Sequence, residues 1–326
     1  MAANIDLKSI SSVTEVLKNW TYLPYLQYFS GREQCAEAYL AQYKEITEDC
    51  LDDKGALLAV TKGNWFAGLR RIAGESESLN LKMARLEPLI FNETSFDIAT
   101  IAQGAKFLRE VLDRASDIQH VAAPVSSADT FSQLVLQECG FKLADTIVCH
   151  HIDLEKMADS PANKYVRQAT PADVEAVAKI AERSFSDRRL SLNRFLCDPH
   201  FDAALVGKMY AKWTTAAILN NDCDANMVFD DGKIAGFYTF RLPHHRGADA
   251  KIGLAMAVLS AVDPDQARKG VFGSLQQAGC QWLKENGAKI VEVKTVLPNK
   301  PVNRVCQKMN SNVVFTYHTF HWARQA

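Results

Sequence analysis

The segment from Leu254 to Leu283 constrains the fold most, because it reads as a strand, a short basic turn and a helix in direct succession. An apolar run ends at Val262, and the turn that follows contains Gly270 and Gly273. Glycines let the backbone approach a ligand closely, and the N–H groups at a helix N-terminus favour an anion such as pyrophosphate. An ordinary strand-to-helix connection can have the same pattern, so the surrounding sequence must decide between the two interpretations.

The spacing of this turn excludes two common nucleotide sites. A Walker loop needs four residues between its first glycine and Gly-Lys, and the turn is too short for that. A dinucleotide-binding fold needs the spacing G-x-G-x-x-G, which is also missing. Nucleoside triphosphates and NAD are therefore disfavoured as ligands of this turn.

The length and the net charge of the chain limit its domain organisation and its possible partners. A chain of 326 residues is longer than a single core usually supports, so two domains are expected. Lys plus Arg number 37 and Asp plus Glu number 38, which leaves a formal net charge of −1. This balance predicts no nucleic-acid partner, because no net positive field would attract one.

The sequence predicts a cytoplasmic protein without a membrane span. The first residues show no basic and apolar leader pattern, and no apolar run reaches the length of about 18 residues that a span requires. The eight cysteines are scattered, without C-x-x-C and without zinc-ligand spacing to histidine, so we expect reduced thiols and no metal site.

The second half of the chain follows an α/β order after a polar segment, Lys156 to Lys164, which indicates a linker. Thr170 can cap a helix with Pro171 at its first position. Apolar patterns predict strands at 165–168, 226–229, 234–241, 254–262, 290–297 and 313–322, and helices from Pro171 toward Phe185 and at 200–219, 271–285 and 301–308.

The first half fits the same order more loosely. The patterns predict strands at 55–61, 66–72, 79–91, 118–125 and 141–152, with helices at 102–115 and 128–138. This similarity of order suggests an internal duplication of one fold unit. The alternative is that any α/β chain can be aligned with another in this way.

The element order, with a basic glycine turn after the fourth strand and a short helix after the fifth, resembles the GNAT-type N-acetyltransferases. The resemblance implies an α/β (α+β) fold of tandem GNAT-like domains, each a mixed, mostly antiparallel sheet flanked by helices, with strands four and five splayed in the second domain. The expected domains are residues 1–156, a degenerate GNAT-like domain, a linker at 157–164, and residues 165–326, an acetyl-CoA-binding domain.

The resemblance also implies which residues bind acetyl-CoA. The fourth strand would offer its backbone to pantetheine, the turn would hold the pyrophosphate, and an asparagine after the fifth strand would reach the coenzyme. Carried over by position, these residues are Leu259, Ser260, Ala261 and Val262 for pantetheine, Arg268, Lys269, Gly270, Val271, Phe272 and Gly273 for pyrophosphate, and Asn299. The turn departs from the family pattern at two positions, where this chain has Ala267 and Phe272.

The proton donor for the departing thiolate is less clear, because Cys306 stands where the family often has a tyrosine. A thiol with an ordinary pKa of about 8.5 could donate a proton, and a packed structural role is the alternative. Tyr317 and His321 on the last strand are further candidates, with His318 on the opposite face. A base could act through water toward His244, His245 or Asp249.

A second, narrower resemblance concerns the acceptor. The run from Ser184 to Phe201 and the ending Tyr317 to His321 are similar to TDP-fucosamine acetyltransferases and related sugar-nucleotide amine acetyltransferases. This implies a small-molecule amine acceptor on a nucleotide sugar, bound by Arg188, Arg194, Tyr210 and Trp213. The alternative is that Arg194 and Trp213 only hold two helices together.

Other functions remain open on the sequence alone. The same fold could acylate a protein or another small amine, or bind acyl-CoA without turnover. In the first half, Phe91 to Asp97 is acidic and lacks glycine, which disfavours a second pyrophosphate site. The sequence leaves a homodimer as one possible assembly.

Overall fold

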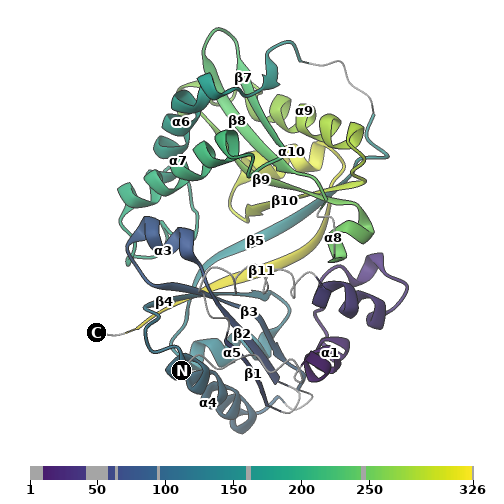
Figure 1. Ribbon diagram of the computed structural model, residues 1–326, viewed down its shortest axis with the longest axis vertical. Helices are drawn as coiled ribbons and strands as arrows, with labels where there is room; N and C mark the ends of the chain where they lie inside the picture. Colours follow the sequence, from purple (N-terminus) through teal and green to yellow (C-terminus); the bar gives the residue numbers. More distant parts are fainter. Residues whose placement is uncertain are drawn as a thin grey trace. The chain divides into compact units, whose positions relative to one another are not determined.

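The computed structural model describes residues 10–41, 58–62, 65–93, 96–158, 163–243 and 247–324. The chain forms two compact units that do not follow the order of the sequence (Figure 1). Unit 1 contains residues 1–146, 246–248 and 316–326, and unit 2 contains residues 147–245 and 249–315. Part of the predicted linker, 159–162, lies outside the described residues.

Unit 1 contains a mixed sheet in the order β1-β2-β3-β4-β11. β3 and β4 pair in parallel, and the other neighbouring strands pair antiparallel. Its strands are β1 (Leu58–Lys62), β2 (Trp65–Arg71), β3 (Met83–Phe91), β4 (His120–Ser126) and part of β11 (Asn312–Ala323), and its helices include α1 (Ile10–Asn19), η2 (Leu26–Tyr28), α3 (Ala73–Leu79), α4 (Ile98–Arg114) and α5 (Thr130–Glu138).

Unit 2 contains a second mixed sheet in the order β5-β10-β9-β8-β7-β6, with β9 and β10 parallel and the other pairs antiparallel. Its strands are β6 (Val166–Gln168), β7 (Ala225–Asp230), β8 (Ile234–Arg241), β9 (Leu254–Val262), β10 (Ile290–Val296) and part of β5 (Lys142–Asp153). Its helical segments are η3 (Pro171–Asp173), α6 (Val174–Ser186), α7 (Ala203–Leu219), most of α8 (Gly247–Ile252), η4 (Pro264–Gln266), α9 (Val271–Glu285) and α10 (Lys300–Lys308).

The two repeats of the fold exchange their last strands. β5 follows α5 in the chain, yet Ile147–Asp153 pairs with β10 of unit 2. β11 follows α10, yet Tyr317–Ala323 pairs with β4 of unit 1. Each sheet is therefore completed by a strand from the other half of the sequence.

The repeated element order confirms the predicted fold class. In both units an antiparallel hairpin leads to a third strand, a helix, a parallel strand and a short helix. The described α-helices α1, α3 and α8 were not predicted. The prediction placed Leu79 in a strand, but Leu79 ends α3 and Asn80, with a φ of 54°, turns the chain before β3.

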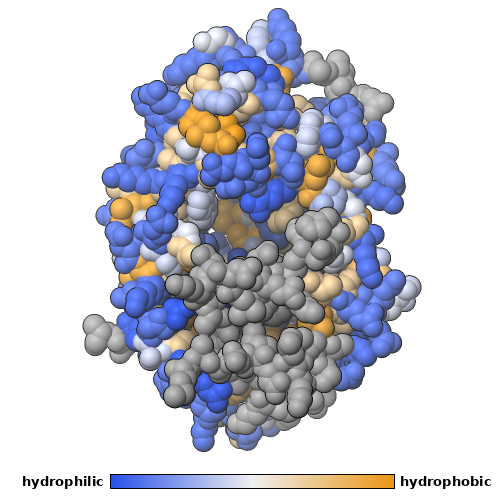
Figure 2. Space-filling model, viewed as in Figure 1, coloured by the Kyte–Doolittle hydropathy of each residue, from blue (hydrophilic) through white to orange (hydrophobic). Residues whose placement is uncertain are grey.

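Each sheet buries one face against its own pair of helices. In unit 1, α4 and α5 contribute Phe107, Leu108 and Val135 to a core under β2, β3 and β4. In unit 2, α9 and α10 contribute Leu275 and Cys306 to a core with β8, β9 and β10. Hydrophilic residues dominate the visible face in Figure 2, with hydrophobic residues in small patches. Among the described residues, no helix is both long and apolar enough to span a membrane.

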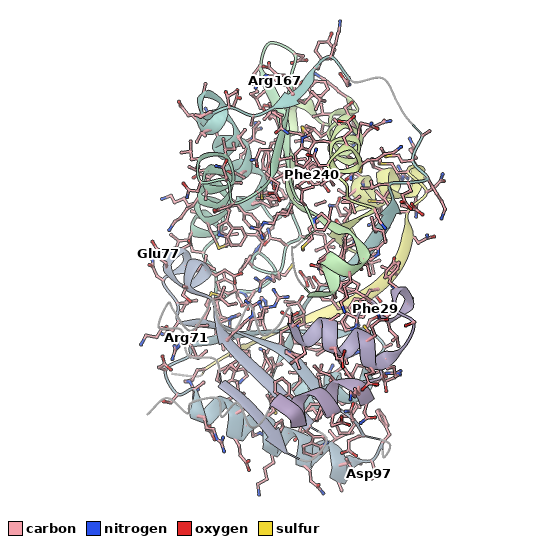
Figure 3. All side chains as sticks on the ribbon, turned by 45° about the vertical axis from the view of Figure 1, so that its right-hand side comes forward. Phe29, Arg71, Glu77, Asp97, Arg167 and Phe240 are labelled. Atoms are coloured by element: carbon pink, nitrogen blue, oxygen red, sulfur yellow. The ribbon has the colours of Figure 1, made fainter. Side chains whose placement is uncertain are left out.

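An arginine at the edge of unit 2, Arg167, joins β6 to η3 and β7. Figure 3 labels this residue. Arg167 Nη1 and Nη2 donate to the two carboxylate oxygens of Asp173 at 2.7 and 2.8 Å, and Nη2 also donates to Asp230 at 2.7 Å. Asp173 accepts the backbone N–H of Thr170 as well, which completes a capping box at the start of η3. The predicted helix start at Thr170 and Pro171 is thereby confirmed.

We expect the Arg167→Met variant to lose about 1–2 kcal/mol of unfolding free energy at pH 7, because the buried Asp173 carboxylate loses its cation. The Arg167 guanidinium lowers the pKa of Asp173 and of Asp230. Groups with a lowered folded pKa stabilise the fold above their unfolded pKa of about 3.9, and this contribution is lost as the pH falls below that value. Urea unfolding at pH 7 and pH 3 should show the wild-type advantage shrinking in acid. An equal difference at both pH values would contradict this account.

Candidate functional site

The edge of β9 becomes open toward β10 in the middle of the sheet of unit 2. The parallel pairing of the two strands ends at Ala257 and Val293, although β9 continues to Val262 and β10 to Val296. A β-bulge interrupts the pairing of β9 with β8 at the same level, because Thr239 faces Leu259 and Phe240 faces Ala257. The extra residue, Val258, is 41% exposed. The predicted splay of the fourth and fifth strands is confirmed.

The open part of β9 presents alternate backbone groups to the gap. Asp263 N donates to Ala235 O of the β8 side at 2.9 Å, and successive N–H groups of a strand point to opposite sides. The groups of Ser260 and Val262 therefore point away from β8. Leu259 N donates to Thr239 Oγ1 at 3.2 Å, on the β8 side. Of the four β9 residues in that prediction, Ser260 and Val262 have backbone groups directed toward the gap between β9 and β10.

The basic turn after β9 is fixed to helix α6. Arg183 donates to Asp263 at 3.1 Å and to both carboxylate oxygens of Asp265 at 2.9 and 3.1 Å. Asp263 also accepts the N–H of Asp265, which starts η4. Arg268 then adopts a φ of 68°, a left-handed conformation that few residues other than glycine adopt. These contacts determine where the turn meets the next helix.

Helix α9 begins at this turn without a side-chain cap. Its N-cap is Gly270, with a φ of 79°, and no side chain accepts from the first turn. A Cβ placed on Gly270 or Gly273 would meet no atom within 4 Å, so the backbone here is accessible. The exposed N–H groups of a helix start bind anions, and Arg268 and Lys269 are exposed beside them. This arrangement suits a pyrophosphate group.

Two side chains of the predicted pyrophosphate segment belong to the core. Val271 is 3% exposed, and the ring of Phe272 stacks on Tyr238 with 5.4 Å between centroids. Their side chains therefore fix α9 to the sheet, and only their backbone N–H groups face the turn. The departure from the family pattern at Phe272 has this packing reason.

Asn299 and Cys306 both lie on or beside α10. The Asn299 side chain accepts from Val302 N as the N-cap of α10, and its Nδ2 donates to Thr295 Oγ1 at 3.0 Å. Cys306 is 0% exposed, and burial raises the pKa of its thiol to about 11. A buried thiol of high pKa is a poor proton donor for a substrate, which favours the packed structural role.

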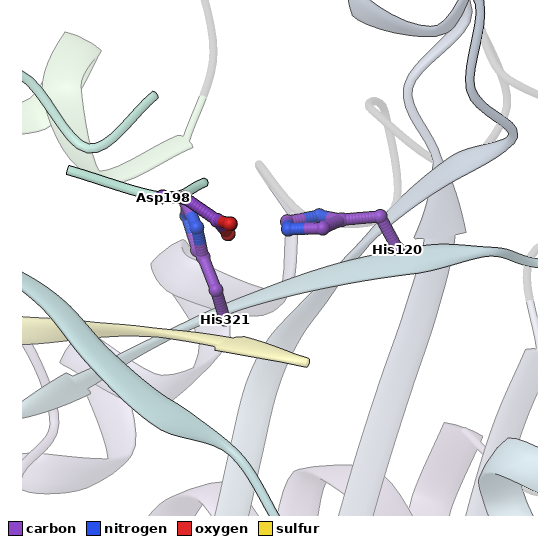
Figure 4. A group of neighbouring side chains, drawn as sticks. All are labelled: His120, Asp198 and His321. Carbon is purple, nitrogen blue, oxygen red and sulfur yellow. The ribbon is translucent and has the colours of Figure 1, made fainter. Parts of the chain in front are cut away.

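The two other predicted catalytic residues belong to unit 1. Tyr317 pairs with Ser126, and His321 pairs with Ala122, in the antiparallel ladder of β11 and β4. His321 is 5% exposed and packs edge to face with His120, with 4.7 Å between ring centroids; Figure 4 shows both rings. His318 Nδ1 lies 2.9 Å from Thr146 Oγ1. The structure thus places Tyr317 and His321 outside the unit that contains Cys306 and the basic turn.

The predicted acceptor residues differ in their surroundings. Tyr210 is 8% exposed and stacks on Phe185, with 4.0 Å between centroids. Trp213 is half-buried and packs edge to face on Tyr210 at 5.0 Å. The Arg194 guanidinium lies over the Phe195 ring at 4.2 Å, and Arg188 is exposed. The aromatic residues chiefly pack α6 on α7, whereas Arg188 remains accessible to a ligand.

Unit 1 also has a bulge in the strand that corresponds to β9, which is β3, but the residues there are less suited to binding a coenzyme. Ala67 faces Leu89 and Leu69 faces Leu86, so β3 has an extra residue at Glu87–Pro88. Proline has no N–H to offer at this position. The helix after β3, α4, is capped by Asp97, whose carboxylate accepts Thr100 N at 2.8 Å. A carboxylate in this position repels a phosphate, in contrast to Gly270 in unit 2.

A buried ionic cluster in unit 2 was missed by the sequence analysis. His151 Nε2 lies 3.2 Å from Glu292 Oε2, and Lys294 Nζ lies 2.7 Å from Glu292 Oε1. Burial raises the pKa of Glu292, but Lys294 and His151 outweigh it and lower the pKa to about 2. An imidazole beside a carboxylate is a pair of side chains that occurs in general-base sites. Only the pairing of β5 with β10 reveals this cluster, since His151 is far away in the sequence.

The sequence suggested three other residues as candidates for a base. His244 and His245 lie outside the described residues. Asp249, on α8, is 6% exposed. The structure therefore adds the cluster of His151 and Glu292 to the candidates.

Solved structures share this fold at low sequence identity. A GCN5-related N-acetyltransferase from Sphaerobacter thermophilus has a TM-score of 0.50 at 14% identity, over 79% of this chain and 76% of that one. A conserved protein of unknown function from Staphylococcus epidermidis has a TM-score of 0.51 at 8% identity, over 82% and 95%. A GCN5-related glucosamine N-acetyltransferase region of a fungal multidomain β-N-acetylglucosaminidase has a TM-score of 0.54 at 11% identity, over 79% of this chain and 31% of that one.

The sequence itself matches a family over the part of unit 2 that contains the open edge and the basic turn. No curated protein shows significant sequence similarity to the chain. Residues 189–310, however, match the acetyltransferase (GNAT) family. With the repeated element order in units 1 and 2, the chain has a tandem GNAT-like fold, in which residues 189–310 are the part that is similar to the acetyltransferase (GNAT) family.

Proposed function

We propose that unit 2 binds acetyl-CoA and transfers the acetyl group to a primary amine. The observation that carries this proposal is the continuous path from the open edge of β9 through a turn with two positive-φ residues, Arg268 and Gly270, to the uncapped start of α9. A strand edge can bind the amide groups of pantetheine, and a helix start can bind the pyrophosphate. The residues present therefore fit coenzyme A.

In this proposal, different residues of unit 2 bind the pantetheine and the pyrophosphate of the coenzyme. Ser260 and Val262 offer backbone groups to pantetheine, while Gly270, Gly273 and the side chains of Arg268 and Lys269 receive the pyrophosphate. Acetyl-CoA, when bound, supplies the acetyl group as an activated thioester. Val258 has no partner in the β8 ladder at the bulge, and a backbone N–H at this level of the open edge can stabilise a developing oxyanion. Holding the amine beside the thioester supplies much of the rate enhancement.

For the acceptor, we propose an amine on a nucleotide sugar. The support is the exposed guanidinium of Arg188 and the partly exposed Arg194 on the chain segment between α6 and α7. Arginine recognises a diphosphate through paired hydrogen bonds. The fungal region with the same fold is itself a glucosamine N-acetyltransferase. Tyr210 supports this segment from the core, and Trp213 offers a partly exposed ring.

The experiment combines calorimetric titration of acetyl-CoA with an assay of free-thiol release. The wild type and the matched pair Arg268→Gln and Arg268→Glu are titrated first. We expect micromolar binding that weakens in Arg268→Gln and falls further in Arg268→Glu, because a negative charge replaces the cation at the pyrophosphate. Thiol release is then measured with amino-sugar nucleotides, free amino sugars, small amines and peptides.

The outcomes separate the competing functions. Turnover limited to amino-sugar nucleotides supports the proposal in full, and turnover with peptides or small amines alone replaces the acceptor. Binding without thiol release from any acceptor would identify an acyl-CoA-binding protein. A wild type that binds no acetyl-CoA would overturn the transferase function itself.

A further inference from the structure

The basic turn after β9 contains negative as well as positive side chains. Residues 263–269 include two aspartates, Asp263 and Asp265, and two cations, so the side-chain charges of this segment cancel. The segment is compact, because Lys269 Nζ reaches back and donates to Gln266 Oε1 at 2.7 Å. The two carboxylates therefore lie within a few residues of the start of α9, where a negative charge would repel a bound phosphate.

Arg183 of α6 balances these two carboxylates. Its guanidinium donates to Asp263 Oδ1 at 3.1 Å and, with both terminal nitrogens, to the two carboxylate oxygens of Asp265 at 2.9 and 3.1 Å. Lys233 is a more distant second partner, with its Nζ 3.8 Å from Asp263 Oδ2. Among the described residues, Arg183 is the only cation that forms an ion pair with Asp265. The charge of Asp265 is therefore compensated by α6 alone.

The part of α6 that carries Arg183 is fixed by close packing on α7. A Cβ on Gly207 of α7 would lie 2.8 Å from the backbone oxygen of Glu182 and 2.8 Å from the Cβ of Ser186. Since real Cβ atoms do not approach other atoms so closely, the glycine is what lets the two helices meet here. Arg183, next to Glu182, therefore starts from a rigid backbone.

Stability does not account for this arrangement. The side chains of Arg183 and Asp265 are 50% and 67% exposed, and ion pairs with this exposure contribute little to folding. Asp263 is 7% exposed, but it also accepts the N–H of Asp265 and keeps that bond without the arginine. What Arg183 changes is the charge around the turn. With it and Lys233, two cations face the two carboxylates, and the remaining cations of the turn are left for an anion.

We propose that Arg183 enables the turn to accept the pyrophosphate of coenzyme A, because it neutralises Asp263 and Asp265 and holds their carboxylates against α6. The inference rests on the proposed function and deepens it. Arg183 acts through the two aspartates and is a positioning residue that does not touch the ligand. Without the arginine, the uncompensated carboxylate of Asp265 would oppose the attraction of the cations in the same turn.

The test is whether a second change restores what the loss of Arg183 removes. Acetyl-CoA is titrated calorimetrically into the wild type, Arg183→Gln, Arg183→Lys, Asp265→Asn and the double variant Arg183→Gln/Asp265→Asn. We expect Arg183→Gln to bind about tenfold more weakly, the effect of one uncompensated charge near the surface. Arg183→Lys, which keeps the charge, should retain most of the affinity. The double variant should return to within about threefold of the wild type, because the repelling carboxylate is gone.

Titrations at low and high salt then separate charge from shape. The deficit of Arg183→Gln should shrink in high salt, because ions screen exposed charges. Urea unfolding should give every variant a midpoint close to that of the wild type. A double variant as weak as Arg183→Gln, or a deficit that salt leaves unchanged, would show that Arg183 only braces the turn and would overturn the inference. Wild-type affinity in Arg183→Gln would overturn it as well, with acetyl-CoA binding intact. A wild type that binds no acetyl-CoA would overturn the proposed function itself.

Discussion

The Gly273→Asp variant is expected to lose at least a hundredfold in affinity for acetyl-CoA without losing stability. Gly273 lies in the first turn of α9, and a Cβ there meets no atom within 4 Å. A carboxylate in the first turn of a helix stabilises it by about 0.3–1 kcal/mol through the helix dipole. The same carboxylate would occupy the place of the pyrophosphate and repel it. The change would copy the situation that Asp97 creates at the start of α4.

The matched control for this prediction is Gly273→Asn, which has the same shape without the charge. Calorimetric titration should show a much smaller loss of affinity for the asparagine variant, and urea unfolding should show both variants to be as stable as the wild type within about 0.5 kcal/mol or slightly more stable. Equal losses for Asp and Asn would mean that bulk at the turn, and not charge, prevents binding. Wild-type affinity in Gly273→Asp would place the pyrophosphate elsewhere.

The Gly279→Ala variant should lose about 2 kcal/mol of unfolding free energy, although alanine favours helices. Gly279 lies in the middle of α9, and a Cβ there would overlap the ring of Phe240, whose Cε1 atom lies 2.8 Å away (Figure 3 labels Phe240). Phe240 is 0% exposed and cannot move aside easily. Overpacking costs about 1–3 kcal/mol, and here the upper end applies, against a gain of about 1 kcal/mol in helix propensity. The clash therefore outweighs the propensity.

A double variant tests the cause of this effect. In Gly279→Ala/Phe240→Leu the smaller side chain leaves room for the new methyl group. Urea unfolding of the wild type, both single variants and the double variant should give a favourable coupling of about 1 kcal/mol or more. Additive losses would show that the two residues do not compete for one space. A stabilised Gly279→Ala would show that α9 and β8 are less tightly packed than the structure indicates.

The local elements could be predicted from the sequence because their signals are local. The apolar run at Leu254–Val262 and the glycine turn gave the limits of β9 and the start of α9, which the structure confirms. The divergence of β9 and β10 followed from the family resemblance. The bulge could not be predicted, because it depends on how Thr239 and Phe240 pair with β9.

Features that depend on distant pairing could not be predicted in this way. Nothing in the composition of β5 or β11 tells which sheet each one joins, so Tyr317 and His321 were placed beside Cys306 as candidates, although their ladder belongs to unit 1. For the same reason, the sequence did not reveal the contact of His151 with Glu292. For Cys306 the sequence left two roles open, and only its burial distinguishes them. The binding roles of Asn299 and of the acceptor residues stay predictions.

The exchange of β5 and β11 has a consequence for synthesis on the ribosome. The sheet of unit 1 needs Tyr317–Ala323, which is translated after nearly all the rest of the sequence. At about 5–20 residues per second, the first half of the chain therefore waits for roughly ten seconds or more with the edge of β4 uncovered. An unpaired edge of this kind recruits other strands. Nascent chains of this protein should accordingly depend on chaperones more than a protein whose domains close in the order of their synthesis.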